Sequence, residues 1–204
     1  MVLPTPQLPR KMRRIIFEAS VSLDGFIEGP SGELDWIGPS DERGSYIEAK
    51  KFLSSFDTIF FGRKAYEKIG LIHPDTNLSE SDREFCYMMH GMRKYVFSRT
   101  AKHVPGNAMV ISRDVKEEVT RIREEDGKNI WFCGGADILK TFSALDLIDE
   151  YVLAVQPVLL KSGRPLFPGS KWPLDLTLVD RQNLDSGVVI LHYRPESRLN
   201  ISYI

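Results

Sequence analysis

The stretch Asn129-Ile-Trp-Phe-Cys-Gly-Gly-Ala-Asp-Ile-Leu-Lys-Thr-Phe142 indicates both the fold class and a candidate ligand site. Residues 130–133 form an apolar run with β-branched and aromatic members, which predicts a buried strand. Gly134 and Gly135 end that strand, and the apolar spacing after them predicts a helix over 136–145. Paired glycines let the backbone approach a ligand closely, and a helix N-terminus attracts an anion. The stretch favours a phosphate site, although many α/β proteins make this turn with nothing bound.

Length and composition are those of one ordinary globular domain. The chain has 204 residues, of which 42% are hydrophobic and 27% charged. Its net charge of −1 attracts neither nucleic acid nor an acidic membrane, and no apolar run reaches the length of a membrane span. The two cysteines and the four scattered histidines form neither a disulfide framework nor a metal-ligand cluster. We expect a cytoplasmic protein without a metal site that binds neither nucleic acid nor membrane.

Predicted strands and helices alternate along most of the chain, and only strands follow residue 145. That order predicts a single α/β domain, with a mainly parallel central sheet flanked by helices and a C-terminal antiparallel hairpin. The domain is expected to span 13–195, between a proline-rich tail at 1–12 and a C-terminal tail at 196–204. The predicted strands are 13–21, 57–61, 94–97, 108–112, 130–133, 150–160, 174–180 and 187–193, and the predicted helices are 40–54, 65–69, 114–125 and 136–145.

Glu18 is unexpected within the first strand. It shares a face with Ile16 and Ser20, while the apolar residues at alternate positions face the other way. It sits either at the wet end of the strand, which is the commoner arrangement, or in the lining of a polar pocket. The run 22–37 that follows contains three glycines and a proline, which predict a long irregular loop.

Three predicted strands end in loops that suit a phosphorylated ligand. The loops are Gly62-Arg63-Lys64, Ser98-Arg99 and Gly134-Gly135. Ligands of open α/β sheets bind outside the carboxyl ends of the strands, so these loops are expected to meet at one edge. Because guanidinium pairs bidentately with phosphate, Arg63 and Arg99 favour NADPH, the phosphorylated nicotinamide cofactor, over NADH. The alternative is three ordinary solvated turns.

Several short motifs occur along the chain: Val21–Ile27, Asp35-Trp36, Ile59–Glu67, Tyr95–Ser98 and Phe132–Gly135. In order and approximate spacing they resemble dihydrofolate reductase. The segment Val155–Leu160 with Pro165–Phe167, and the loop Ser22–Gly25, look more like the reductase domain of bacterial riboflavin biosynthesis, the RibD C-terminal domain, which belongs to the same superfamily. The resemblance implies hydride transfer from NADPH to a C=N or C=O carbon of a pterin-like, folate-like or pyrimidine-like heterocycle.

The resemblance also implies where the cofactor and the substrate lie. The loop after the first strand folds over the nicotinamide, the Gly-Arg turn holds the 2′-phosphate, and the peptide between Gly134 and Gly135 is cis. Asp24 is implied at the substrate, although a turn residue before Gly25 is an equally simple role. The implied cofactor residues are Ser20, Ile27, Gly62, Arg63, Lys64, Ser98, Arg99, Gly134, Gly135, Ala136, Asp137 and Ile138, and the implied substrate residues are Asp24, Trp36 and Cys133.

Asp41 and Glu42 are the candidate catalytic acids. In dihydrofolate reductases an acidic residue five or six places after the loop tryptophan holds the pterin ring, and here Trp36 precedes both carboxylates at those distances. A carboxyl group in a partly buried pocket has a raised pKa, which suits protonation of a substrate at neutral pH. The alternative role of both residues is to cap a helix N-terminus.

Two departures leave the substrate open. Ser45 stands where the folate enzymes usually have an aromatic residue, and Lys161 stands where the riboflavin enzymes usually have glycine. The first alternative to a folate-like reductase is therefore 5-amino-6-(5-phosphoribosylamino)uracil reductase. The alternative from another class is a protein that binds NADPH or a folate-like ligand without turnover. A homodimer through a sheet edge also agrees with the resemblance to the riboflavin enzymes.

Overall fold

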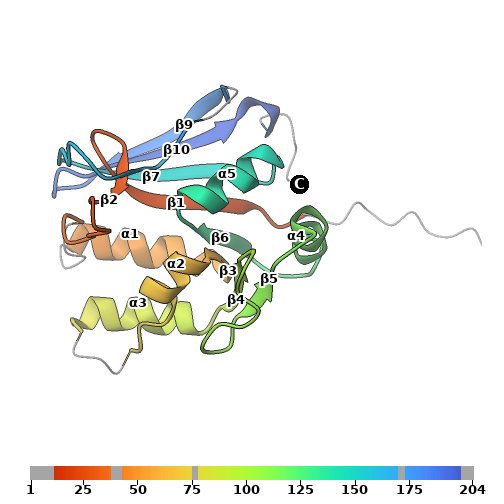
Figure 1. The fold of residues 1–204 in the computed structure, drawn as a ribbon. Coiled ribbons are helices and arrows are strands. Elements are labelled where there is room, and N and C mark those ends of the chain that lie inside the picture. Colours follow the sequence, from red (N-terminus) through yellow and green to blue (C-terminus); the bar gives the residue numbers. More distant parts are fainter. Residues whose placement is uncertain (1–11, 38–42, 75–77, 170–172, 199–204) are drawn as a thin grey trace, which may run out of the picture.

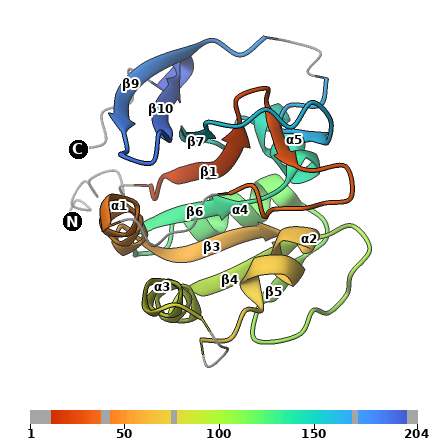
Figure 2. The ribbon, with the colours of Figure 1, turned by 90° about the vertical axis from the view of Figure 1, so that its left-hand side faces the viewer.

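Eight strands form one sheet, whose order across the molecule is β5-β4-β3-β6-β1-β7-β10-β9 (Figure 2). The computed structural model describes residues 12–37, 43–74, 78–169 and 173–198. Every strand expected from the sequence is present within those ranges. The strands are β1 Ile15–Ser22, β3 Phe56–Gly62, β4 Arg93–Phe97, β5 Met109–Ile111, β6 Asn129–Cys133, β7 Glu150–Gln156, β9 Leu176–Asn183 and β10 Val189–Pro195.

Strand direction confirms the predicted fold class. The strands from β5 across to β7 pair in parallel, with Phe17 of β1 opposite Phe132 of β6 and opposite Tyr151 of β7. The last two strands pair antiparallel, so that β10 lies between β7 and β9 at one edge of the sheet. The chain is thus a single α/β domain with a mainly parallel sheet and a C-terminal antiparallel hairpin.

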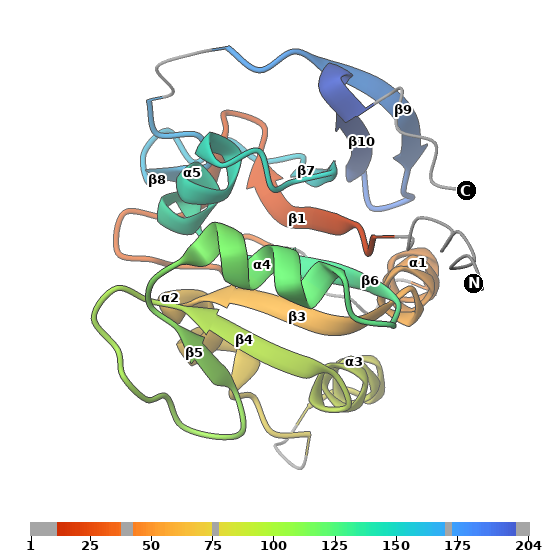
Figure 3. The same cartoon turned by 90° about the vertical axis from the view of Figure 1, so that its right-hand side faces the viewer.

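Helices cover both faces of the sheet. Helices α1, Arg43–Ser54, and α3, Glu80–His90, lie side by side on one face (Figure 1), and α4, Val115–Arg123, and α5, Ala136–Ala144, lie over the other (Figure 3). Short turns complete the set: α2 Arg63–Ala65, a π-helix at Tyr66–Gly70 and a 3₁₀-helix at Glu196–Arg198. None of the described helices combines the length and the hydrophobicity that a membrane span requires.

The central strands are apolar throughout because successive side chains enter different cores. Phe60 of β3 packs under α4 and α5 with Phe132 and Phe142, whose rings stack at 4.4 Å. Phe61, the next residue, packs on the opposite face with residues of α1 and α3. A strand that is buried on both faces loses the alternation of polar and apolar residues. That loss explains the continuous apolar run that identified β6 in the sequence.

Helix α3 is the one long described element that the sequence analysis did not assign. Ser79 caps it by accepting a hydrogen bond from the backbone N–H of Asp82 at 3.1 Å, and Glu80 lies in the first turn. Cys86 and Met89 are buried on its inner side. The sequence therefore held a usable signal, a serine cap followed by acidic residues and an apolar face.

Other differences concern the ends of elements. Strand β2, Phe26–Glu28, pairs with β8, Arg164–Pro165, inside what was expected to be an irregular loop. Strand β7 ends at Gln156, earlier than predicted, because Pro157 has no N–H to donate to a neighbouring strand. Asp114 precedes α4 but has φ 49° and makes no side-chain cap. The expected tail at 1–12 and the end of the chain beyond 198 lie almost wholly outside the described residues.

A buried ion pair joins α4 to the beginning of β1 and to the segment before β7. Arg123 donates from Nη2 to both carboxylate oxygens of Asp149, at 3.1 and 2.9 Å, and from Nε to the carbonyl of Arg13 at 3.0 Å. Asp149 also accepts the backbone N–H of Ile15 at 2.8 Å. The Asp149 side chain is fully buried and that of Arg123 is 7% exposed. This geometry satisfies both charges in a place where an unpaired charge is costly.

Asp149→Ala should therefore destabilise the protein by about 3–5 kcal/mol, because it leaves Arg123 buried without a counter-ion. Urea unfolding followed by circular dichroism measures this loss. The control is Arg121→Ala, which removes an exposed pair with Glu118 and Glu125 and should cost at most about 1 kcal/mol. Equal losses in the two variants would contradict the importance assigned to the buried pair.

Candidate active site

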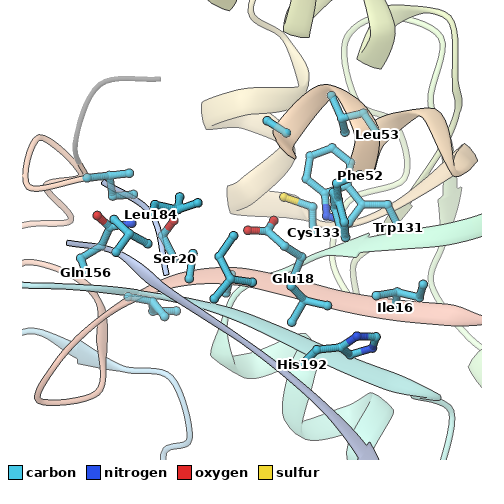
Figure 4. A pocket seen from close by; sticks show the side chains of 18 of the residues that line it. Ile16, Glu18, Ser20, Phe52, Leu53, Trp131, Cys133, Gln156, Leu184 and His192 are labelled. Atoms are coloured by element: carbon cyan, nitrogen blue, oxygen red, sulfur yellow. The ribbon is translucent and has the colours of Figure 1, made fainter. Parts of the chain in front are cut away.

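A cavity of about 1030 Å³ opens between α1 and the sheet. Its wall on the sheet side includes residues of β1, β6, β7 and β10, and the end of α1 lies opposite (Figure 4). The loop after β2 also lines the cavity. The cavity reaches the carboxyl ends of β1 and β6, the edge at which open α/β sheets bind ligands. It therefore meets the region expected to contain the cofactor loops.

Glu18 lies in the middle of β1 and points into this cavity, toward Cys133 and Trp131 (Figure 4). Burial raises the pKa of its carboxyl from the ordinary 4.5 to about 7, although the Trp131 indole N–H lowers it again in part. Among the described residues no cation forms an ion pair with Glu18. The sequence left two positions open for Glu18. The position in a pocket is correct, and the position at the solvent-exposed end of the strand is wrong.

Trp131 and Cys133 flank the Glu18 carboxyl from the neighbouring strand. The buried indole Nε1 of Trp131 faces Glu18, but within the described residues it makes no hydrogen bond of normal geometry. Its ring is held edge-on by Phe52 and Phe85, with centroids at 6.3 and 6.1 Å. Burial, and then the nearby Glu18 carboxylate, raise the pKa of the Cys133 thiol far above its usual range. Cys133 is consequently a neutral wall residue and not a thiolate nucleophile.

A second glutamate on the same face of the sheet has the opposite environment. Glu150 of β7 binds His192 Nε2 at 2.7 Å, Arg14 at 2.6 Å and Arg194 at 2.8 Å. Burial by itself would raise the pKa of Glu150, but the His192 hydrogen bond and the two guanidinium charges lower it below the usual value. The same face thus holds Glu150, a carboxylate bound by three basic side chains, and Glu18, an acid without an ion-pair partner among the described residues. Their surroundings shift the two pKa values in opposite directions, down for Glu150 and up for Glu18.

The two predicted glycine turns meet at the end of the cavity. A Cβ on Gly62 would lie 3.8 Å from the backbone nitrogen of Gly135, so the turns after β3 and β6 are neighbours. A Cβ on Gly134 would collide with the Phe132 ring and approach Ile138 Cγ2 to 2.6 Å, whereas a Cβ on Gly135 meets nothing within 4 Å. Gly134 is therefore required by packing, and Gly135 faces open space at the beginning of α5.

The expected cis peptide is wrong, because every peptide bond of the described residues is trans, including the one between Gly134 and Gly135. Gly135 has φ −81° and ψ 176°, an extended conformation that leads directly from β6 into α5. The chain thus brings the helix N-terminus to the cavity without a reversed peptide.

The predicted phosphate-binding cations lie around these turns. Arg63 of α2 is half exposed and pairs with Glu67 at 2.8 Å. Lys64 lines a second cavity of about 730 Å³ together with Lys68 and Arg164. Arg164 in turn pairs at 2.6 Å with Asp137 in the first turn of α5, so a cation stands over that helix N-terminus. These basic side chains therefore lie beside the two glycine turns.

The remaining candidates divide between the cavity and its surroundings. Ser98 follows β4 and accepts the backbone N–H groups of Thr100 and Ala101, at 3.3 and 3.0 Å, while Arg99 beside it is exposed. Ala136 is buried. Asp41 and Glu42 lie outside the described residues. The cavity lining includes Ser20, Ile27, Trp36, Cys133, Gly134 and Gly135.

Asp24 is not among the residues that line the cavity, and its side chain instead connects two loops. Its carboxylate accepts the Ser22 hydroxyl at 2.7 Å and the backbone N–H groups of Leu160 and Lys161, at 3.1 and 2.7 Å. The Ser22 hydrogen bond, followed by those of the backbone, lowers the pKa of Asp24 below its usual value. Asp24 thereby connects the loop after β1 to the loop after β7. This contact resembles the turn role before Gly25 that the sequence offered as the alternative to substrate binding.

Comparison with known proteins identifies the family. The family model of the RibD C-terminal domain matches residues 13–190. The uncharacterized protein YyaP of Bacillus subtilis (strain 168) is 39% identical over 183 residues, which are 90% of this chain and 95% of YyaP. The chain belongs to the RibD C-terminal domain family.

Two solved structures confirm the dihydrofolate-reductase-like fold. One is a diaminohydroxyphosphoribosylaminopyrimidine deaminase/5-amino-6-(5-phosphoribosylamino)uracil reductase from Thermotoga maritima, with a TM-score of 0.64 and 17% identity over 91% of this chain and 57% of the other. The other is dihydrofolate reductase from Enterococcus faecalis complexed with NADP(H), with a TM-score of 0.61 and 15% identity over 90% of this chain and 96% of that enzyme. At such identities the likeness is one of fold.

The raised pKa of Glu18 predicts how stability depends on pH. The folded state keeps the proton up to about pH 7, whereas the unfolded chain loses it near 4.5, so this group stabilises the fold in acid and ceases to do so as pH rises through 7. Glu18→Gln should thus gain about 1–3 kcal/mol relative to the unchanged protein between pH 5 and 8. Urea unfolding at both pH values measures the difference, and a difference that does not vary with pH would contradict the assignment.

Proposed function

We propose that this protein is an NADPH-dependent reductase that transfers hydride to a pterin-like, folate-like or pyrimidine-like heterocycle. The main support is the position of Gly135, which faces open space where the cavity meets the N-terminus of α5. A cofactor backbone can approach closely there, and the free N–H groups of the helix suit its diphosphate. Membership of the RibD C-terminal domain family and the dihydrofolate-reductase-like fold support the same function.

The surrounding residues fit the rest of the cofactor. Arg63, Lys64 and Arg99 would hold the 2′-phosphate, and Ser98 follows the strand next to the Gly62 turn. Ser20 and Ile27, which line the cavity, would border the nicotinamide. When bound, the cofactor supplies the hydride, and the chain supplies orientation and a proton.

The substrate would occupy the part of the cavity between α1 and the sheet. Apolar side chains of Ile16, Phe52 and Val152 line that part and would exclude water from a flat ring. Asp41, with Glu42 as the alternative, remains the acid proposed from the sequence, since both precede α1.

The family also supports the first alternative, reduction of a ribosylaminopyrimidine as in riboflavin biosynthesis. NADPH oxidation measured with dihydrofolate, a dihydropterin and 5-amino-6-(5-phosphoribosylamino)uracil separates the two reductase functions. NADPH binding without oxidation of NADPH by any of the three would favour the binding protein without turnover.

Location and assembly complete the proposal. We propose a cytoplasmic enzyme that acts on a small molecule and binds no nucleic acid. A homodimer would use the edge strand β9, on which Leu178 and Val179 are 45% and 39% exposed.

Arg63→Ala should narrow the preference for NADPH over NADH by about 1–3 kcal/mol, because it removes a charged hydrogen bond to the 2′-phosphate. Titration of both cofactors, followed by fluorescence or calorimetry, measures the preference. Arg121→Ala is the matched control, since Arg121 also belongs to an exposed ion pair on a helix. An unchanged protein that binds NADPH and NADH equally well would show that the 2′-phosphate is not recognised.

The two glycines should respond differently to the same added methyl group. Gly135→Ala should keep its stability within about 1 kcal/mol and weaken NADPH binding at least tenfold, because its Cβ enters the space assigned to the cofactor. Gly134→Ala should lose about 1–3 kcal/mol of stability, since its Cβ overlaps Phe132 and Ile138. Thermal unfolding and NADPH titration of both variants test this pair. Unimpaired NADPH binding by Gly135→Ala would place the cofactor elsewhere.

A further inference from the structure

Glu18 is a costly residue for the position it occupies. An acid placed mid-strand among apolar side chains destabilises the fold whenever it ionises, and no cation of the described residues compensates it. Glu150, on the same face, shows that this sheet can neutralise a carboxylate, since three side chains bind it. The unpaired acid in the cavity thus differs from an ordinary structural carboxylate, and such groups mark functional sites.

We propose that Glu18 is the catalytic acid of this cavity, and that its carboxyl group donates a proton to the nitrogen or oxygen of the C=N or C=O bond that receives the hydride. This inference rests on the proposed reductase function. It assigns to a β1 side chain the role that the sequence analysis gave to Asp41 or Glu42.

The proposed step balances in atoms and electrons. The substrate carbon forms a C–H bond with the hydride supplied by the reduced nicotinamide cofactor, which is oxidised. The π bond of the substrate breaks, and its electron pair moves to the nitrogen or oxygen. That atom takes the proton of the Glu18 carboxyl, which becomes a carboxylate. A proton from water, entering through the open side of the cavity, restores the acid.

The position of Glu18 on β1 places it close to the proposed site of hydride transfer. Parallel pairing puts Ile16 opposite Trp131 and Phe17 opposite Phe132, so that the next residues along the two strands, Glu18 and Cys133, lie beside each other, and both line the cavity together with Trp131. Cys133 immediately precedes the Gly134-Gly135 turn assigned to the cofactor. The acid points toward Cys133, the residue before the turn (Figure 4), and the turn itself lines the same cavity.

Trp131 is the positioning residue of this arrangement. Its buried Nε1–H makes no hydrogen bond of normal geometry among the described residues, and it faces the Glu18 carboxyl. Two rings hold the indole edge-on, so this N–H has a fixed direction. In the proposed arrangement this N–H would be donated to one carboxyl oxygen, which leaves the other oxygen to carry the proton toward a ligand.

In the described part of the chain, the other titratable groups near Glu18 do not suit the role. On β6, Cys133 has a pKa raised by burial and keeps its proton. On β7 and β10, Glu150 and His192 are bound to each other at 2.7 Å. On α1, the cavity residue Lys51 is exposed to solvent. Glu18 is the group whose pKa, raised by burial to about 7, lets it give and regain a proton at neutral pH.

The first test measures the ionisation of Glu18 directly, in the absence of substrate. Tryptophan fluorescence of the cofactor-free protein should show a transition near pH 7, because Trp131 faces the titrating carboxyl. The transition should persist in His192→Gln, which removes the other nearby titratable ring, and disappear in Glu18→Gln. A transition that persists unchanged in Glu18→Gln would overturn the proposal.

The second test separates the acid from the cofactor site. Glu18→Gln should bind NADPH within about twofold of the unchanged protein, yet lower NADPH oxidation at pH 6 at least a hundredfold, the scale of general acid catalysis. Activity of the unchanged protein should fall above pH 7, and this fall should vanish in Glu18→Gln. The oxidation assay uses whichever of dihydrofolate, dihydropterin or ribosylaminopyrimidine is turned over.

The outcomes distinguish this inference from the proposed function. Full activity of Glu18→Gln, together with loss of activity in Asp41→Asn or Glu42→Gln, would overturn the role of Glu18 and leave the reductase intact. An unchanged protein that binds no NADPH, or that binds it and turns over no substrate, would overturn the reductase and the catalytic role together. A Glu18-dependent transition near pH 7 would then show only that the acid is buried.

Discussion

The need to cover both faces of a parallel sheet determines where this protein has its cavity. On one face, α4 and α5 pack against the central strands and complete an aromatic core. On the other face, α1 and α3 pack mainly against β3, β4 and β6. The remaining part of that face, formed by β1, β7 and β10, becomes the wall of the cavity. Because the described helices on this face leave part of the eight-stranded sheet uncovered, a cavity forms there.

Strand β1 serves the core and the cavity at once, because neighbouring side chains point to opposite faces. Phe17 packs against Phe132, with ring centroids 5.3 Å apart, and anchors the core under α4 and α5. Glu18, the next residue, faces the cavity with a pKa raised by burial. The packing of Phe17 and its neighbours keeps Glu18 in a buried environment, although a carboxylate is more stable in water. Packing energy thus offsets the cost of a buried acid.

The loops at the carboxyl edge are joined to one another and not only to their own strands. Asp24 holds the loop after β1 against the loop after β7, and strands β2 and β8 pair between the same two loops. Arg164, from the second loop, reaches Asp137 at the N-terminus of α5. Such cross-connections hold the loops after β1 and β7 and the beginning of α5 together at the rim of the cavity.

The sequence by itself determined the sheet, the order of its elements, the C-terminal hairpin and the glycine turn before α5, because periodicity, turn residues and apolar runs are local properties of the chain. The sequence also predicted Arg63, Lys64 and Gly135 as cofactor-site candidates, because loops that follow parallel strands lie at the same edge of the sheet. It left Glu18 undecided between a wet strand end and a pocket, and it did not assign α3 despite the Ser79 cap. Only the tertiary structure decided that α1 leaves the β1–β7–β10 face open, that Trp131 faces Glu18, and that Asp24 binds a loop more than 130 residues away, at Leu160 and Lys161. Those relations depend on which distant segments pack together, and burial, which sets the pKa of Glu18, exists only once they do.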